Sequence, residues 1–215
     1  MLTLHHLENS RSQRIAWAME CLDLSYEIKR YARDPSMAAP EELKKIHPLG
    51  KAPILTDDEL VLAESGAIIE YLIDRYDEEQ NLRPATPEGL QAYRFWLHFA
   101  EGSLMPLLLV MILCKKMGES PVPALIRPIG HKLGEGMSDA FVQPRLEPQL
   151  KLIESTLAKT SWLAGNQLSG ADIQMSFPLL TLEKRRSLDN YPNLLSYLKR
   201  IKSHSAFQRA MARVE

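Results

Sequence analysis

The residues best suited to chemistry gather in three short motifs, and the first lies near the N-terminus. Its sequence, NSRSQR over residues 9–14, stands between an expected strand and an expected helix. Backbone N–H groups at a helix start point outward and favour an anion, so the Ser10 hydroxyl could donate a hydrogen bond to a thiolate held there. Ser10 followed by Gln13 also fits the S-x-x-Q capping box, so a structural explanation of Ser10 stays open at this point.

The second motif, PLGKAPIL over residues 48–55, sets a proline at the start of an expected strand, after a glycine turn. Proline in the first position of a strand costs no ladder hydrogen bond, so Pro53 is compatible with a purely structural role. A cis peptide between Ala52 and Pro53 would instead turn the backbone groups of Ala52 toward a ligand.

The third motif, ESGAIIEYL over residues 64–72, places an acid and a hydroxyl at a helix start. Ser65 is a candidate N-cap, and Glu64 would interact favourably with the helix dipole. Together with free N–H groups, the two side chains would also form a receptor for an amino acid head group, with the ammonium on Glu64 and the carboxylate on Ser65. That arrangement suits a γ-glutamyl end.

Short strands and helices would position these motifs, and the first 78 residues predict them. Strands are expected over residues 2–6 and 26–31, with apolar residues at helical spacing between them. A short helix around residues 40–46, strands around 53–55 and 60–62, and a helix over 65–76 follow. The expected order is therefore βαβ and then αββα.

A polar segment with two prolines, DEEQNLRPATP over residues 77–87, separates this part from long helical patterns. Apolar residues then recur every three or four positions, as in Leu90, Tyr93, Leu97 and Ala100. We therefore expect an α/β domain over residues 1–78 and an all-helical domain over residues 87–215.

The composition excludes several classes of protein. With 26 basic and 27 acidic residues, the chain has no net positive charge that would attract nucleic acid or an anionic membrane. The longest apolar run, residues 104–114, contains Pro106 and is too short to span a bilayer. The first residues, MLTLHH, lack the basic start and apolar stretch that are typical of a signal peptide. Cys21 and Cys114 form no disulfide framework, and the histidines have no metal-binding spacing. We expect a soluble cytoplasmic protein without a metal, nucleic acid or membrane partner.

In this order and spacing, the motifs NSRSQRIAWAMECLDLSYE, HPLGKAPIL and ESGAIIEYL resemble the thioredoxin-like half of the cytosolic glutathione S-transferases. The second half agrees: FWLHFAEGSLMP resembles the start of that family's helical domain, and WLAGNQLSGADI resembles its internal capping box with a buried aspartate. The resemblance spans nearly the whole chain. It implies a thioredoxin-like, glutathione-binding domain followed by an all-helical domain that forms the electrophile pocket.

The resemblance implies that Ser10 is the catalytic residue, as in serine-type bacterial and fungal members whose helix begins with SR. In other serine classes the active position would fall at Asn9, which has no hydroxyl to donate. Ser12 is the further neighbour expected to contact glutathione. Residues 9–12 contain no cysteine, which disfavours the cysteine-type lyases and thiol transferases of the family.

The same resemblance supplies the other glutathione contacts. Glu64 and Ser65 match the clamp on the γ-glutamyl moiety, and Lys51 could reach the glycine carboxylate. Ala52 with Pro53 matches the backbone clamp on the cysteinyl moiety, which predicts a cis bond between them.

The implied function is that of a glutathione transferase, with glutathione as co-substrate and a small hydrophobic electrophile or peroxide as its target. The rival hypothesis is a non-catalytic interaction or stress-response regulatory protein on the same fold. Retention of Ser10, Glu64 and Ser65 favours the enzyme. The family habit of pairing the first domain of one subunit with the helical domain of the other predicts a homodimer. Residues 1–80, with 9 basic and 16 acidic residues, carry a net charge of −7 and the remainder +6, so opposite charges would meet across its two-fold axis.

Overall fold

The computed structural model describes residues 1–33 and 39–214, and its N-terminal part has the predicted order of elements. Strand β1 (Leu2–Leu7), helix α1 (Ser12–Cys21) and strand β2 (Tyr26–Tyr31) form the βαβ unit. The αββα unit consists of helix α2 (Glu41–Ile46), strands β3 (Ile54–Asp57) and β4 (Leu60–Ala63), and helix α3 (Ser65–Tyr76). The predicted fold class is confirmed.

The four strands form one mixed sheet in the order β2-β1-β3-β4, with β1 parallel to β2 and antiparallel to β3. Side chains of a strand alternate between its two faces. Leu2 and Leu4 belong to the main core with α1 and α3, whereas Leu7 packs with Leu43 of α2 on the other face. His6 therefore lies on the α1 face of the sheet.

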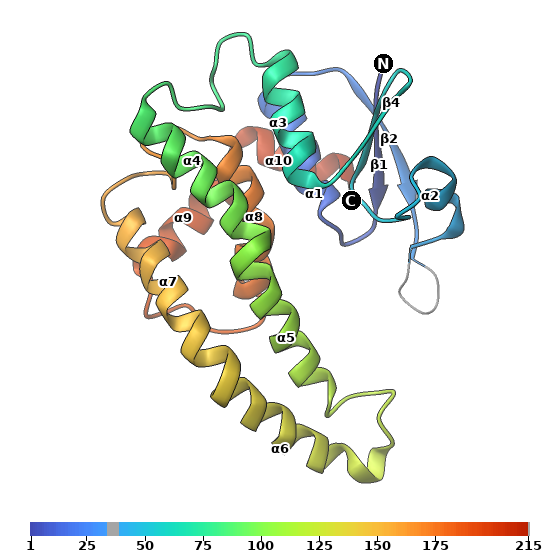
Figure 1. The fold of residues 1–215 in the computed structure, drawn as a ribbon, viewed down its shortest axis with the longest axis vertical. Helices are drawn as coiled ribbons and strands as arrows, with labels where there is room; N and C mark the ends of the chain where they lie inside the picture. The colour runs from blue at the N-terminus through green and yellow to red at the C-terminus, as the bar shows by residue number, and fades with distance from the viewer. Residues whose placement is uncertain (34–38, 215) are drawn as a thin grey trace.

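The remainder is helical, apart from one isolated bridge between Trp162 and Gly165 within the described residues, which confirms the prediction for this part. Figure 1 shows α5 and α6 as an arm that extends away from the sheet. The helices are α4 (Pro87–Phe99), α5 (Met105–Lys116), α6 (Arg127–Met137), α7 (Gln143–Leu157), α8 (Gly170–Glu183), α9 (Pro192–Ser203) and α10 (Ser205–Val214). A short 3-10 turn over Ala124–Ile126 precedes α6.

Two π-helical turns, Ala100–Leu104 and Ser138–Val142, join α4 to α5 and α6 to α7. Each π turn ends two residues before a proline, Pro106 and Pro144 respectively. Proline has no N–H to donate and its ring clashes with the carbonyl four residues earlier, and local widening of the helix relieves both problems. The helices thus continue through the prolines instead of breaking.

The sequence analysis considered only the apolar run over residues 104–114, which is too short to span a bilayer. They belong to a continuous 30-residue helix over Pro87–Lys116, which is long and apolar enough to cross a membrane by length and composition. Core helices of soluble proteins have the same properties, and 39% of its most apolar window is buried inside the protein.

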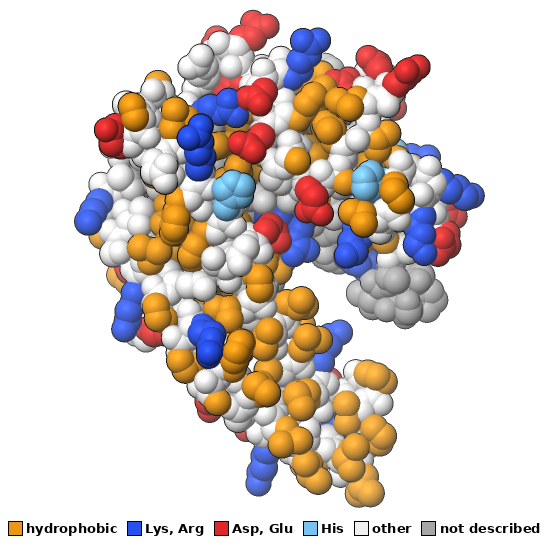
Figure 2. Space-filling model, viewed as in Figure 1, with side chains coloured by type: hydrophobic (Ala, Val, Ile, Leu, Met, Phe, Trp, Pro, Cys, Tyr) orange, Lys and Arg blue, Asp and Glu red, His pale blue; other side chains and the backbone are white. Residues whose placement is uncertain are grey.

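The apolar surface of the arm is conspicuous in Figure 2, where orange side chains gather over α5 and α6. Soluble monomers rarely leave apolar side chains exposed in such number on one region. The exposed ones are Leu109, Leu113, Met117, Leu125, Ile126, Ile129, Leu133, Met137 and Phe141.

Helix α8 connects the two parts of the molecule. Most of its residues are buried, and α1, α3, α4 and α9 all pack against it, so one continuous core joins sheet and helices. Its start carries the expected capping box: the Ser169 side chain accepts from the third helical residue, and Asp172 accepts from the Ser169 backbone. Asp172 is fully buried and also accepts bonds from Leu163 N–H and the Tyr197 hydroxyl.

Candidate functional site

The loop between β1 and α1 carries the residue predicted to be catalytic. Helix α1 begins at Ser12, its N-cap position is Arg11, and no side chain caps it, so the capping box of Ser10 with Gln13 does not form. The Ser10 hydroxyl instead accepts a hydrogen bond from Ser12 N–H at 3.3 Å. The backbone of Asn9 is left-handed, with φ of 51°, and turns the chain into the helix.

The two serines differ in access to the surface. Ser10 is 6% exposed, whereas Ser12 is fully buried behind it. The Oγ atoms of Ser10 and Ser12 are 2.7 Å apart, and the Ser12 Oγ is also 2.7 Å from Nδ1 of His6. Ser12 was expected to contact glutathione, but here its hydroxyl is occupied by two protein partners.

The peptide bond between Ala52 and Pro53 is cis, as predicted. It follows Gly50, which has a φ of 56°, in the connection between α2 and β3. A side chain at Gly50 would be strained by this backbone and would meet the aliphatic stem of Lys44. Glycine therefore lets the chain turn sharply before the clamp, where Lys51 is exposed and Pro53 is buried.

In the third motif, helix α3 begins one residue earlier than it would if Ser65 were its N-cap. Glu64 occupies the N-cap position, with φ of 70° and ψ of 117°, and Ser65 is the first helical residue. A non-glycine residue held at positive φ is uncommon, and such residues cluster at functional sites. Glu64 is exposed and Ser65 almost fully buried, so a charged and a neutral polar group stand side by side at the start of α3.

A hollow of about 230 Å³ brings the second and third motifs together. Lys51, Ala52, Pro53, Glu64 and Ser65 all line it. The first motif contributes Arg11, while Ser10 and Ser12 do not line the hollow. The remaining lining residues are Leu49, Ala63 and Glu101.

Glu101 lines this hollow, and the sequence analysis did not single it out. It lies in the π turn after α4 and accepts two hydrogen bonds from Arg11, at 2.9 and 3.1 Å. It also pairs with Arg14, whose side chain is 1% exposed and donates to the backbone oxygen of Gln174. Glu101 thus joins α1, α8 and the long α4–α5 helix at the edge of the hollow.

The charges in this cluster compensate one another. Burial by itself would raise the pKa of Glu101, but the hydrogen bonds and positive charges of Arg11 and Arg14 outweigh it, so the pKa lies below its ordinary value. Burial lowers the pKa of Arg14 to about 10, against the opposing effect of Glu101. Glu101 and Arg14 are therefore both charged at neutral pH.

A second, larger cavity of about 870 Å³ shares Arg11 with the first. Helices α5, α8 and α10 supply most of its wall, and Asn9, Arg11 and Gln13 border it from the α1 side. The Arg11 guanidinium lies 5.3 Å from the centre of the Phe177 ring. The apolar lining consists of Met105, Ile112, Phe177, Leu180, Phe207 and Met211.

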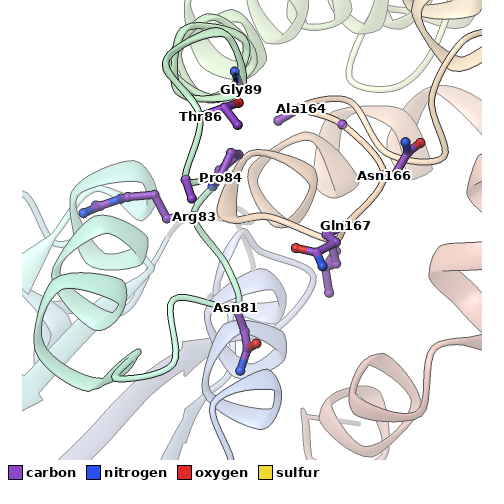
Figure 3. A pocket seen from close by; sticks show the side chains of 11 residues that line it. Asn81, Arg83, Pro84, Thr86, Gly89, Ala164, Asn166 and Gln167 are labelled. Carbon is purple, nitrogen blue, oxygen red and sulfur yellow. Dashed lines mark hydrogen bonds between the residues drawn. The ribbon is translucent and has the colours of Figure 1, made fainter.

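Another hollow, of about 390 Å³, lies between the start of α4 and the loop before α8 (Figure 3). Arg83, Thr86, Asn166 and Gln167 are among its polar lining residues, and it shares no residue with either cavity described above. It holds no acid, cysteine or histidine. Among the residues the structure describes, no three metal-ligating side chains gather into a metal site.

Comparison with known proteins gives a consistent result. Residues 1–74 match the family model of the glutathione S-transferase N-terminal domain, and residues 130–210 match a model of the C-terminal domain. The chain is 34% identical to "Glutathione S-transferase 1" of Saccharomyces cerevisiae, covering 96% of this chain and 92% of that protein.

Solved structures agree with the sequence matches. A crystal structure of a glutathione S-transferase from Actinobacillus pleuropneumoniae is 37% identical, with a TM-score of 0.78 over 100% of this chain and 93% of that one. A glutathione transferase homologue from Lodderomyces elongisporus, solved with two glutathione molecules per subunit, is 19% identical and shares the fold, with a TM-score of 0.76 over 98% of this chain and 97% of that one.

Proposed function

The chain belongs to the glutathione S-transferase family of enzymes, and on that premise we propose that Ser10 activates the thiol of bound glutathione for attack on a small hydrophobic electrophile or a peroxide. The single observation that carries this proposal is the hollow in which five of the predicted glutathione contacts meet beside the Ser10 loop. These residues come from two motifs that are separate in the sequence. Their convergence supports a common ligand.

The hollow offers complementary groups to each part of glutathione. Glu64 would hold the α-ammonium of the γ-glutamyl end, and Ser65 would donate to its carboxylate at the start of α3. The backbone of Ala52 would pair with the cysteinyl moiety, and Lys51 would reach the glycine carboxylate. The cysteine sulfur would then point toward the β1–α1 loop.

In that loop Ser10, which matches the catalytic position of the serine-type members, is a better candidate than Ser12 or Asn9 for contact with the sulfur. It retains some exposed surface whereas Ser12 has none, and Asn9 has no hydroxyl. A free thiol has a pKa of about 8.5 and is only a few per cent ionised at neutral pH, whereas the thiolate is the nucleophile. Lowering the pKa by about two units takes about 2.7 kcal/mol, a magnitude within reach of one charge-assisted hydrogen bond and a helix N-terminus.

The larger cavity beside Arg11 would hold the second substrate. Its apolar wall suits a hydrophobic body, and Lys184 and Arg185 at its border suit an anionic end. With an electrophilic carbon, the thiolate forms a C–S bond while a leaving group departs or the resulting carbanion takes a proton. With a peroxide, the thiolate attacks one oxygen, an alcohol leaves after protonation, and a second glutathione converts the sulfenic acid to disulfide and water.

We propose further that the enzyme is a homodimer, as predicted from the family habit. The exposed apolar face of the α5–α6 arm supports this proposal, because soluble proteins rarely leave such a face exposed and a second copy of the chain would bury it. The cytoplasmic location expected from the sequence stays a prediction.

The first experiment measures conjugation by Ser10→Ala with a panel of electrophiles and peroxides. We expect the rate to fall by one to two orders of magnitude, or about 1.4–2.7 kcal/mol, with glutathione affinity within a few-fold of the parent. Ser155→Ala is the control, because Ser155 is an exposed serine of α7 that lines neither cavity. An unchanged rate and unchanged thiol ionisation would remove Ser10 from the mechanism.

The second experiment tests the head-group site by calorimetry. Glu64→Ala and Ser65→Ala should each weaken glutathione binding by about 1–3 kcal/mol, because each removes a partner of a charged group. Glu59→Ala changes an exposed acid in the β3–β4 turn and should have no such effect. If both site variants fold and bind as tightly as the parent, glutathione does not bind in this hollow as proposed.

A further inference from the structure

Behind Ser10 lies a short chain of buried polar groups that the proposed function does not use. The Ser10 Oγ is 2.7 Å from the Ser12 Oγ, which is 2.7 Å from Nδ1 of His6. His6 and Ser12 are both buried, one in β1 and the other in the first turn of α1. Sheet and helix therefore hold the three groups in fixed order.

Counting protons shows why the direction of this chain matters. Each of the two contacts needs one proton between its heavy atoms, and a hydroxyl has only one proton to donate. If Ser10 donates to Ser12, Ser10 has no proton left for a bound sulfur. The Ser12 proton then goes to Nδ1 of His6, because among the described residues the buried Ser12 hydroxyl has no third partner to which it could donate. In that direction Ser10 can only accept the thiol S–H, which favours the neutral thiol over the thiolate.

In the opposite direction, Nδ1–H of His6 donates to Ser12 and the Ser12 hydroxyl donates to Ser10. The Ser10 oxygen then accepts from both the hydroxyl and the backbone N–H of Ser12. Its own proton is the only valence left, and it is free to point into the site. A donor to the sulfur favours the thiolate.

We infer that His6, with a proton on Nδ1, sets the direction of the His6–Ser12–Ser10 hydrogen-bond chain so that Ser10 donates to the glutathione sulfur. The inference rests on the proposed function of Ser10. His6 and Ser12 are positioning residues in it, because they act on the sulfur only through Ser10. No oxidant or further reactant is involved, because the two arrangements differ only in which group donates each hydrogen bond.

The surroundings of His6 agree with a ring that keeps a single proton at neutral pH. Burial lowers its pKa, and Arg30, its partner in the parallel register of β2, lowers it further against the weaker opposing effect of Glu8. A neutral imidazole has one N–H, so its tautomer alone decides whether Nδ1 donates or accepts.

The test compares two substitutions of nearly equal shape at position 6. In His6→Asn the amide N–H can replace Nδ1–H as the donor to Ser12, whereas in His6→Asp an ionised carboxylate can only accept. The measurement is the pKa of the glutathione thiol bound to the full-length enzyme, from the ultraviolet absorbance of the thiolate. We expect His6→Asn to stay within about 0.3 unit of the parent and His6→Asp to raise the thiol pKa by about one unit, a roughly tenfold loss of thiolate below that pKa.

The negative charge of the aspartate would itself raise the thiol pKa, so both changes are repeated with Ser12→Ala, which removes the link. The chain predicts that the difference between His6→Asn and His6→Asp then falls to less than half, whereas a through-space charge effect would persist unchanged. His5→Asn is the matched control. It lies in the same strand on the opposite face, is buried like His6, and bonds to Tyr31 instead.

The outcomes separate this inference from the proposal on which it rests. If Ser10→Ala leaves the thiol pKa unchanged, the function of Ser10 is wrong. If Ser10→Ala raises the thiol pKa but the two position-6 variants behave alike, Ser10 keeps its function and the chain is overturned. Should a variant fail to fold, ¹⁵N NMR of the parent with bound glutathione decides directly: Nδ1 protonated supports the inference, and Nδ1 unprotonated with protonated Nε2 overturns it.

Discussion

Replacing Glu101 by glutamine should destabilise the fold more than the loss of an ordinary surface ion pair. Glu101 receives a bidentate pair of bonds from Arg11 and a further bond from Arg14. Arg14 is 1% exposed, so its charge has almost no access to water. Glutamine keeps the shape and one acceptor oxygen but removes the negative charge that faces the buried guanidinium.

The magnitude follows from the burial of the partners. Removing one member of a buried ion pair costs about 3–5 kcal/mol, because the other charge is left uncompensated. Here the Glu101 side chain is 33% exposed, and Arg14 keeps its bond to Gln174, so water and the remaining bond offset part of this loss. We therefore expect Glu101→Gln to lower the free energy of unfolding by about 2–3 kcal/mol.

Urea unfolding with linear extrapolation measures this loss, and Glu183→Gln is the matched control. Glu183 pairs with Lys202, which is half-exposed, so its charge should contribute only about 0–1 kcal/mol. If Glu101→Gln costs no more than Glu183→Gln, with equal slopes in urea, the Arg14 charge does not depend on Glu101.

Three further predictions concern other parts of the molecule. Glu20 bonds to Tyr26, Arg209 and Arg213. Burial alone would raise the pKa of Glu20, but these partners hold the pKa below its ordinary value. The contribution of Glu20 to the free energy of unfolding is therefore present above pH ~4.3 and is lost as the pH falls through the folded-state pKa. Glu20→Gln should therefore cost about 1–2 kcal/mol at pH 7 and less below pH ~4, and a pH-independent difference in urea unfolding would contradict this. Asp172→Ala should cost at least about 3 kcal/mol, since it leaves buried donors unpaired, against about 1 kcal/mol for the exposed cap in Thr86→Ala, and equal costs would refute the distinction. Sedimentation should detect a dimer that weakens with salt. If the dimer is equally stable at low and high salt, opposite charges do not stabilise its interface. A monomer at micromolar concentration in low salt would contradict the prediction of a dimer.

The elements of the sheet could be predicted from the sequence because each carries a local signal. Strand β2 and helix α3 have the predicted bounds, since apolar periodicity and turn residues mark both ends. Local signals also misled: Ser10 and Ser65 were candidate caps, yet α1 has Arg11 and α3 has Glu64 at the N-cap position. Hydroxyl residues suit a cap, but the N-cap position of α3 is held by Glu64 at a positive φ, which a residue's capping preference does not predict.

Contacts between distant segments could not be predicted in the same way. His6 and Ser12 are six residues apart, but their contact depends on which face of β1 lies under α1, and the alternation of the strand fixes this only once the sheet is packed. Glu101 is 90 residues from Arg11 and lies within a π turn, where the helical repeat that sequence periodicity assumes is interrupted. The π turn just before Pro106 departs from the regular α-helical repeat, so apolar periodicity could not predict which way Glu101 faces. The groups that we propose to act behind Ser10, and the acid at the edge of the hollow, are thus fixed by irregular backbone and long-range packing, whereas the groups predicted to contact the ligand lie in motifs that can be recognised locally.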